Sequence, residues 1–292
     1  MNPARRMDGA AMISGRRLTP HRDDRGVFTE LFRDEWALGV EAERWDLLCL
    51  QDGACRTVGS AVLVALDGRA ELRADGQLTT LEADVPHAVT IAAGEHAELR
   101  ACAGGALIAR GQPAGVGPLP MLPPAWDGPE LPPGVELVNL PMDPGSLELH
   151  DRRRDPPVRP VQWNAVRSRT GVLRGVHCHG RHADLLCVVR GAMQLGLADL
   201  RAGTDHRPLC VEMSGDRPQM VAIPPGVAHG FLFLEDSLHV YAVDHTWDPA
   251  DEAGCRWDDP VLAMPWGLQP ERVSSRDLGL GTLAELREAL TG

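Results

Sequence analysis

The chain has 292 residues, with 41 acidic residues against 29 basic ones and a formal net charge of −12. Nucleic acid and anionic membrane surfaces repel such a chain, so we expect neither as a partner. No apolar run approaches the roughly 18 residues that a membrane span needs, and we expect no secretory leader. The seven cysteines are scattered and form no C-x-x-C pair, which indicates reduced thiols in a cytoplasmic protein.

Short apolar runs that Gly, Pro, Asp and Asn interrupt dominate the chain from about residue 13 onward. Residues 61–78 and 184–201 each contain two such runs joined by a DG or RG pair, a pattern that predicts a β-hairpin. Helical periodicity is convincing only at 282–290, where Leu283, Leu286 and Leu290 share one face. Many hairpins without alternating helices predict an all-β fold, either a sandwich or a barrel.

Residues 111–134 are dense in Pro and Gly, a composition typical of linkers. They divide the chain into an N-terminal domain at 13–110 and a C-terminal domain at 135–292. Both domains contain a hairpin-like core, which suggests an internal duplication. The histidines of the first core, His87 and His96, stand in a strand–Gly turn–strand pattern, and we expect them to be structural.

The stretch GVLRGVHCHGRHADLLCVVRG at 171–191 carries the densest chemistry, and in it His177, His179 and Asp184 follow the spacing G-x5-H-x-H-x4-D-x6-G. Residues two apart on a strand face the same side, so His177 and His179 point the same way. Further on, PPGVAHGF adds His229 in the spacing P-x-G-x2-H. Two or three neutral imidazoles and one carboxylate suit Fe(II), Mn, Ni or Zn. One hypothesis is therefore a divalent metal held by His177, His179, Asp184 and His229.

These two spacings resemble the two-part signature of the cupin superfamily, with Asp184 in place of the usual Glu and Phe233 in place of the usual Asn. The longer strings VQWNAVRSRTGVLRGVH (161–177), ADLRAGT (198–204), VAIPPGVAHGFLF (221–233) and VSSRD (273–277) resemble the dTDP-4-dehydrorhamnose 3,5-epimerase family, a branch of the cupins. This resemblance covers about 160–280. It implies tandem cupin-like jelly-roll barrels, a bicupin, of which the first is degenerate.

The family resemblance also implies a set of catalytic roles without a metal. By position, His177 is the base that takes the proton beside the sugar ketone, and Asp277 is its orienting partner. Tyr241, the only tyrosine of the chain, is the acid on the opposite face. A histidine suits this chemistry because its pKa lies near neutrality. The further substrate-binding positions that the resemblance implies are Gln162, Asn164, Arg174 and His229.

Residues 20–32, PHRDDRGVFTELF, resemble the family's N-terminal arm, D-x-R-G-x-F-x-E, which crosses to a partner subunit and helps to hold the nucleotide. The resemblance implies that Arg25 faces phosphate, that Phe28 packs or stacks on the base, and that Glu30 fixes the segment. The matching segment before the second core, MDPGSLELH at 142–150, has neither the Arg nor the Phe. We therefore predict an intrachain pseudo-dimer, or a homodimer, in which the first arm completes the site of the second core.

Two departures from the family pattern lie beside the base. Asp184 stands where the family has a Lys near the developing enolate oxygen, and His179 stands where it has a Gln. A carboxylate beside an enolate opposes catalysis unless a positive charge lies between them. A divalent cation held by His179, Asp184 and His229 would supply that charge.

The leading hypothesis is an isomerase, a sugar-nucleotide 3,5-epimerase that acts on a dTDP-4-keto-6-deoxy sugar in deoxysugar biosynthesis without a cofactor. The alternative is a metal-dependent cupin enzyme, namely an oxygenase, lyase or cyclase on an epimerase-derived scaffold. A non-catalytic sugar-binding protein is disfavoured, because the base, partner and acid positions are all filled.

Overall fold

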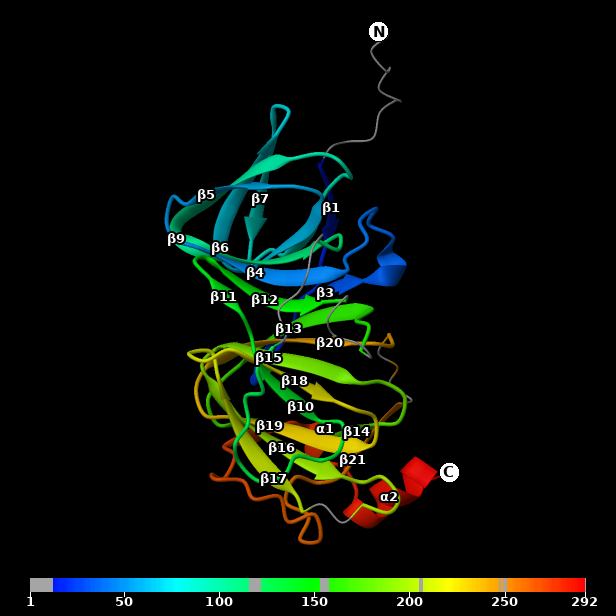
Figure 1. Cartoon of the computed structure of the whole chain (residues 1–292). Helices are drawn as coiled ribbons and strands as arrows, with labels where there is room; N and C mark the ends of the chain where they lie inside the picture. The colour runs from blue at the N-terminus through cyan, green and yellow to red at the C-terminus, as the bar shows by residue number, and fades with distance from the viewer. Residues whose placement is uncertain are drawn as a thin grey trace. The chain divides into compact units, whose positions relative to one another are not determined.

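A computed structural model describes residues 13–115, 122–152, 158–204, 207–246, 248 and 251–291. The chain forms two compact units, both rich in β-strands (Figure 1). The first unit takes residues 1–18, 37–117 and 142–151, and the second takes 19–36, 118–141 and 152–292. Antiparallel sheets make up both units, so the all-β prediction is confirmed.

The first unit contains one sheet, in which the strands follow the order β1-β8-β6-β9-β4-β12-β11, with β5 on β9 and β7 on β6. Its longest strands alternate buried apolar and exposed polar residues, as in Leu72, Arg73 and Ala74. Its core contains Leu63, Leu99 and Ile108 at 0 % exposure. The strands are β1 (Ile13–Arg17), β4 (Arg44–Leu50), β5 (Cys55–Val58), β6 (Ala61–Ala74), β7 (Gln77–Glu82), β8 (His87–Ile91), β9 (Ala97–Gln112), β11 (Met142–Asp143) and β12 (Ser146–Asp151).

The second unit contains two sheets. One has the order β10-β18-β15-β20-β13-β3-β2, and the other has the order β17-β16-β19-β14-β21, with β22 on β14. Apolar side chains from both sheets form one core, which includes Leu186 and Val221 from the first sheet and Met193 and Phe233 from the second. The strands of the first sheet are β2 (His21–Asp23), β3 (Gly26–Arg33), β10 (Glu136–Asn139), β13 (Gln162–Ser168), β15 (Asp184–Arg190), β18 (Gln219–Ile223) and β20 (Ser237–Val243). Those of the second are β14 (Val172–His179), β16 (Ala192–Asp199), β17 (Leu209–Ser214), β19 (Val227–Phe233), β21 (Glu252–Gly254) and β22 (Arg272–Val273).

Helices are short and few among the described residues: η1 (Asp34–Trp36), α1 (Ser275–Leu278) and α2 (Leu283–Thr291). The helix predicted at 282–290 is confirmed, with Leu283 and Leu286 buried. Thr282 and Glu285 cap its start, since the Thr282 N–H donates to the Glu285 carboxylate and the Glu285 N–H donates to the Thr282 hydroxyl. In the part of the chain that the structure describes, no helix has the length and apolar character needed to cross a membrane.

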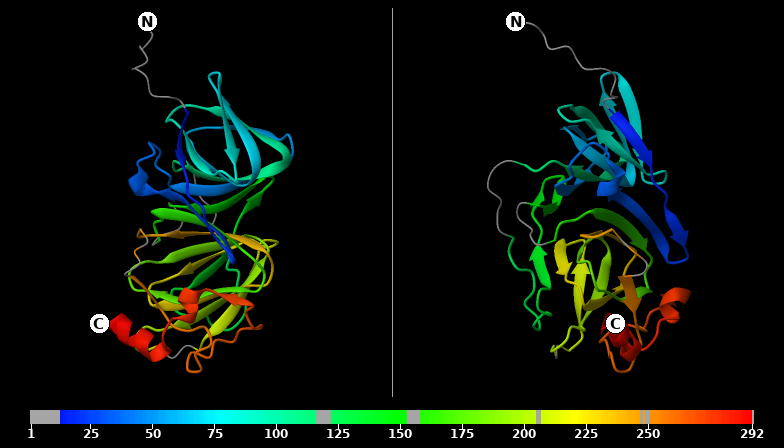
Figure 2. Two further views of the ribbon diagram at one scale, coloured as in Figure 1. Left: turned by 180° about the vertical axis from the view of Figure 1, so that it is seen from behind. Right: turned by 90° about the vertical axis from the view of Figure 1, so that its right-hand side faces the viewer.

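The N-terminal arm belongs to the second unit. Strand β3 pairs antiparallel with β13, from Gly26 opposite Ser168 to Arg33 opposite Gln162, and in Figure 2 the blue strands β2 and β3 lie along this sheet. Conversely, β12 pairs with β4 in the first unit. The predicted boundaries at 13–110 and 135–292 differ from these units. The arm at 20–32 pairs through β3 with β13 of the second unit, and the segment at 142–150 pairs through β12 with β4 of the first unit. Residues 116–121 of the predicted linker lie outside the described residues.

The hairpin predicted within 61–78 is present, but its turn is the second DG pair, Asp75–Gly76, between β6 and β7. At the first DG pair, strand β6 continues through Asp67 and Gly68, where a register shift marks a bulge. Gly68 has φ +66°, and a Cβ there would lie 2.2 Å from a backbone oxygen of Gly105, so a glycine is needed for the bulge and does not mark a turn. The hairpin predicted at 184–201 is wrong, because β15 and β16 belong to different sheets, and Gly191 is the corner at which the chain passes from one sheet to the other.

Candidate active site

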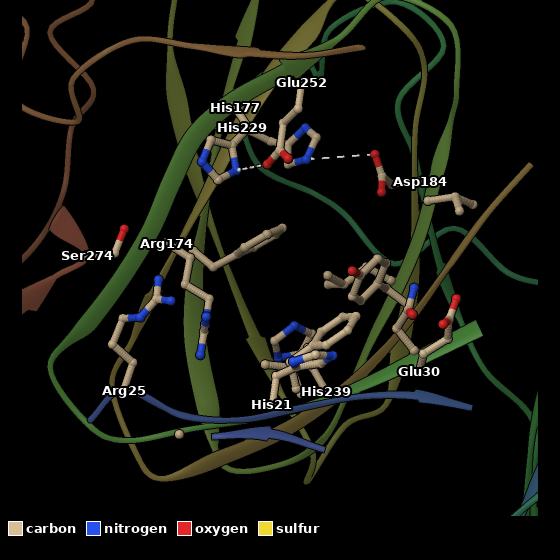
Figure 3. Close-up of a pocket in the computed structure, with 18 of the residues that line it drawn as sticks. His21, Arg25, Glu30, Arg174, His177, Asp184, His229, His239, Glu252 and Ser274 are labelled. Carbon is tan, nitrogen blue, oxygen red and sulfur yellow. Dashed lines mark ion pairs between the residues drawn. The ribbon is translucent and has the colours of Figure 1, made fainter. Parts of the chain in front are cut away.

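A cavity of 580 Å³ lies within the second unit (Figure 3), between strands of its two sheets and the N-terminal arm. All of the site residues predicted from the sequence line it, namely Arg25, Phe28, Glu30, Gln162, Asn164, Arg174, His177, His179, Asp184, His229, Tyr241 and Asp277. The strand pairing explains why residues so far apart in sequence meet here. Strand β3 brings in the arm residues beside β13, and β14 and β20 bring His177 and Tyr241 from different sheets.

His177 lies between two carboxylates. Its Nε2 atom is 2.9 Å from Oδ1 of Asp277, and its Nδ1 atom is 3.3 Å from Oε1 of Glu252. The second of these contacts is drawn in Figure 3. Glu252 is itself held by Arg276, with Nη2 2.6 Å from Oε1. A positive charge that His177 acquires therefore has a carboxylate at each ring nitrogen.

The loop before helix α1 holds Asp277 in an ionised state. Burial by itself would raise the pKa of Asp277, but the hydrogen bonds from His177, Ser274 and the backbone of Gly175 bring it below its ordinary value. The Asp277 N–H donates to Oγ of Ser274 at 2.9 Å, which caps the short helix. Arg25 from the arm adds a positive charge, with Nη1 3.7 Å from Oδ2 of Asp277.

Tyr241 lies in a row of polar residues that crosses three neighbouring strands. It pairs with Asn164 on β13, and Asn164 pairs with Glu30 on β3. Burial, reinforced by the carboxylates of Asp184 and Glu252, raises the pKa of the Tyr241 phenol well above its usual range. The phenol therefore keeps its proton at neutral pH and is available as a donor.

Arg174 is the cation that β14 contributes to the cavity, where it lies beside the arm. Its Nε atom donates to Oγ of Ser168 at 3.0 Å, which leaves the rest of the guanidinium to face the cavity. Burial and then the nearby charge of Arg25 lower the pKa of Arg174. Two neighbouring guanidinium groups repel each other in this way, and an anionic ligand between them would relieve the repulsion.

A second cluster of histidines lies deeper, around Asp184. The rings of His179 and His182 stack with centroids 4.0 Å apart, and those of His179 and His229 are 5.4 Å apart. Burial and then the neighbouring histidines lower the pKa of His179 to about 2. Burial also lowers the pKa of His229 to about 4. Burial, with the carboxylates of Asp244 and Glu252, raises the pKa of Asp184 well above its ordinary value.

The structure groups two members of the predicted metal set, His179 and Asp184, with His182, and leaves His177 and His229 outside the group. The side chains that come within 4.8 Å of one another are those of His179, His182 and Asp184, and His229 lies at the edge of this group, with Nε2 3.7 Å from Oδ2 of Asp184. His177 is engaged by Asp277 and Glu252 instead. His177 and His179 are two residues apart on one strand, so the sequence predicted that both face the same side and bind the same ion. It could not show that they contact different side chains.

The cavity also contains residues that were not assigned from the sequence, among them His182, His239, Glu252 and Arg276. His182 is only three residues after His179, and this proximity was the one signal that could have identified it. Glu252 and Arg276 stand in no recognisable motif. They reach the cavity because β21 pairs with β14, where Gly254 lies opposite His177, and because α1 follows the strand β22.

The two sheets, their shared core and the cavity with a paired His and Asp define an all-β, cupin-like barrel with a site for acid–base chemistry. A family model described as dTDP-4-dehydrorhamnose 3,5-epimerase matches residues 150–285. An Escherichia coli dTDP-4-dehydrorhamnose 3,5-epimerase is 34% identical over 137 residues, which cover 44% of this chain and 74% of that protein. The chain therefore belongs to the dTDP-4-dehydrorhamnose 3,5-epimerase family.

Other relatives extend the likeness. A Streptomyces niveus dTDP-4-dehydrorhamnose 3-epimerase is 34% identical, with 46% of this chain and 67% of that protein covered. The crystal structure of a 4-keto-6-deoxy sugar epimerase from the novobiocin biosynthetic gene cluster of Streptomyces spheroides matches with a TM-score of 0.50 and 29% identity, over 57% of this chain and 94% of that one. The chain covers 63% of the length of a Methanothermobacter thermautotrophicus relative and 65% of a Pseudomonas aeruginosa one.

Proposed function

We propose that this protein is a sugar-nucleotide epimerase that acts on a dTDP-4-keto-6-deoxy sugar by proton abstraction next to the ketone. The observation that carries the proposal is the hydrogen bond of 2.9 Å between His177 and the buried Asp277, in a cavity that also contains Tyr241. The names of the relatives support the substrate class, since they include both 3,5-epimerases and a 3-epimerase.

The ionised Asp277 fixes the tautomer of the base. A carboxylate only accepts hydrogen bonds, so Nε2 of His177 carries the proton and Nδ1 has the free lone pair. Nδ1 is the atom that takes the proton from the carbon beside the ketone. Because Glu252 lies 3.3 Å from Nδ1, a bound substrate has to displace this carboxylate from the base.

Tyr241 returns a proton to the opposite face of the same carbon. It comes from β20, whereas His177 comes from β14 in the other sheet, so the two groups approach from different walls of the barrel. The raised pKa of Tyr241 keeps the phenol protonated, as an acid must be before it acts. Abstraction on one face and return on the other inverts the carbon.

Arg25 and Arg174 bind the diphosphate, Phe28 packs against the nucleotide base, and Glu30 fixes the arm. Gln162 and Asn164 contact the sugar, and His229 lies in the same cavity. The repulsion between the guanidinium groups of Arg25 and Arg174 supports this assignment. A diphosphate bound between the two groups would attract both of them. Strand pairing of β3 with β13 supports a site completed by the arm of the same chain, as an intrachain pseudo-dimer requires.

The test is an incubation of the full-length protein with dTDP-4-keto-6-deoxyglucose in deuterated water, with mass spectrometry and proton NMR of the recovered sugar. Incorporation of deuterium at C3, or at C3 and C5, with inversion supports the proposal and shows whether one or two carbons react. His177→Asn should abolish the incorporation. A wild-type protein that binds the sugar nucleotide but exchanges no proton would overturn it.

The metal-dependent alternative is an oxygenase, lyase or cyclase with Fe, Mn, Ni or Zn, for which the sequence offers His177, His179, Asp184 and His229 as ligands. Its support is the grouping of histidines around Asp184. The hydrogen bond between Nε2 of His177 and Asp277 favours the epimerase, because it places the proton on Nε2 and leaves the Nδ1 lone pair for the substrate proton once Glu252 is displaced.

A further inference from the structure

Asp184 is the point on which two buried histidines converge. Nε2 of His182 lies 3.8 Å from Oδ2 of Asp184, and Nε2 of His229 lies 3.7 Å from the same oxygen. All three side chains are buried, with residue exposures of 3 % for His182, 7 % for Asp184 and 4 % for His229. Figure 3 shows His229 and Asp184 facing each other across the cavity.

The other ring nitrogen of each histidine has a partner that fixes the tautomer. Nδ1 of His229 lies 3.1 Å from the carbonyl oxygen of Val227, and because a carbonyl only accepts, Nδ1 carries the proton. Nδ1 of His182 lies 3.4 Å from a carboxylate oxygen of Asp251, which likewise favours the proton on Nδ1. The two Nε2 atoms therefore present lone pairs toward one carboxylate oxygen.

No hydrogen bond accounts for this arrangement. Distances of 3.7 and 3.8 Å are too long for one, and a protonated Asp184 has a single proton to offer to two acceptors. His179 stacks on His182, and its Nδ1 atom has no hydrogen-bond partner among the described residues. The Nε2 lone pairs of His182 and His229, which face Asp184 without a donor, cost free energy unless a cation lies between them.

We propose that His179, His182, His229 and Asp184 bind one divalent first-row transition-metal cation, next to His177 but without it. With bonds of about 2.1 Å, the edges of a tetrahedral site measure about 3.4 Å, so Nε2 of His182 and of His229 need to approach Oδ2 of Asp184 by only a few tenths of an ångström. His179, whose ring lies within 4.8 Å of His182 and Asp184, completes the set with a larger movement. The Asp251–His182 contact and the Val227–His229 hydrogen bond are outer contacts of the kind that orient metal-binding imidazoles.

The chemistry of the donors selects the class of ion. Three neutral imidazoles and one carboxylate suit Zn²⁺, Fe²⁺, Mn²⁺ or Ni²⁺, whereas Mg²⁺ and Ca²⁺ prefer oxygen ligands. The carboxylates of Asp244 and Glu252 add negative potential around Asp184, which further favours a cation. Because His177 remains bonded to Asp277, a base and a metal can coexist in one cavity.

The site has a consequence for the reaction that rests on the proposed epimerase function. Negative charge develops on the ketone oxygen as the proton leaves, and the chain has no lysine at any position to balance it. A cation at Asp184 offsets this carboxylate and adds positive charge to the wall of the cavity that carries Tyr241, since Leu186, two residues along β15, pairs with Tyr241.

The test measures the metal directly, without substrate. The full-length protein is treated with a chelator, dialysed and titrated with Zn²⁺ by calorimetry, and the bound metal is counted by elemental analysis. We expect one Zn²⁺ per chain, and binding weaker by about 10²-fold or more in Asp184→Asn and in His182→Gln. His177→Asn should retain the ion, because His177 is not a ligand. His245→Gln is the matched control, since this histidine pairs with Asp244 nearby but is 63% exposed.

Circular dichroism and thermal melting establish that each variant is folded, and Asp184→Asn, which keeps the shape of the side chain, provides the answer if His182→Gln does not fold. The proposal is overturned if the wild type binds no stoichiometric Zn²⁺, if Asp184→Asn binds it as well as the wild type, or if His177→Asn loses it. These readouts do not depend on turnover, so a failure of the epimerase assignment is distinguishable from a failure of the metal site.

Discussion

His177 and Asp277 are one hundred residues apart in the chain, and their side chains meet at 2.9 Å between Nε2 and Oδ1. The contact forms because the loop after β22 returns to β14, with which β22 pairs in parallel at Val172 and Leu173. Arg25 and the cap from Ser274 hold the carboxylate in place from the other side. The base is therefore positioned by residues from three separate parts of the sequence.

Asp277→Asn should slow turnover by about 10²-fold or more while the substrate affinity changes little. An amide can donate to Nε2, which favours the wrong tautomer and removes the negative charge beside the imidazolium. The measurement is the rate of deuterium incorporation into the sugar, with kcat and KM determined separately. A variant that keeps the wild-type kcat would show that Asp277 does not orient the base.

Tyr241→Phe should separate the two halves of the reaction. The substitution removes the phenolic proton and keeps the ring, so the base still exchanges the substrate proton with solvent while inversion falls by about 10²-fold or more. Mass spectrometry follows exchange, and NMR coupling constants follow inversion in the same sample. Loss of both signals together, in a folded variant that binds substrate, would contradict the role of Tyr241 as a separate acid.

The sequence predicted those site residues that lie in short segments typical of the family. His177, Tyr241 and Asp277 each stood in a recognisable family segment, and the structure places all three in one cavity. Glu252 could not be found in this way, because it reaches His177 only through the pairing of β21 with β14. The contact partner of each histidine could not be predicted either, because spacing along a strand predicts the face on which a side chain lies but not the residue that it contacts.

The fold class was predictable from the short apolar runs, whereas the connections were not. A glycine after a charged residue served as a turn signal at Gly68 and at Gly191, and neither is a hairpin turn. Gly68 forms a bulge within β6, and Gly191 connects two sheets. Both positions need a positive φ, which the sequence signal detects, but the pairing of the flanking strands depends on distant partners.

Gly191→Ala should destabilise the protein by about 2 kcal/mol or more, because two costs add at this corner. The residue has φ +77°, and a Cβ would lie 2.5 Å from the backbone oxygen of Asp236. Gly203→Ala is the matched control, since its φ of +82° is similar but no atom lies within 4 Å of the added Cβ. Urea unfolding of both variants measures the difference, and equal losses would show that the close contact is relieved.

Arg25→Ala should weaken binding of the sugar nucleotide by about tenfold or more and leave the melting temperature almost unchanged. Arg25 donates to Asp23 two residues away through Nε and Nη2 at 2.9 and 2.6 Å, and an ion pair of this kind with partly exposed partners contributes little to folding. Arg25 instead contributes to ligand binding, because its guanidinium brings a positive charge to the cavity and can donate two parallel hydrogen bonds to a phosphate.

Arg256→Ala supplies the matched control, because Arg256 forms the same fork with Asp258, two residues away, at 2.9 and 2.7 Å. Arg256 does not line the cavity that the described residues enclose. Both variants should melt alike, and only Arg25→Ala should lose affinity for thymidine diphosphate in calorimetry. The loss should shrink as salt is raised, since screening weakens the contact in the wild type as well. Equal affinities in the two variants would remove Arg25 from the diphosphate site, and with it the reason for the arm to join the second unit.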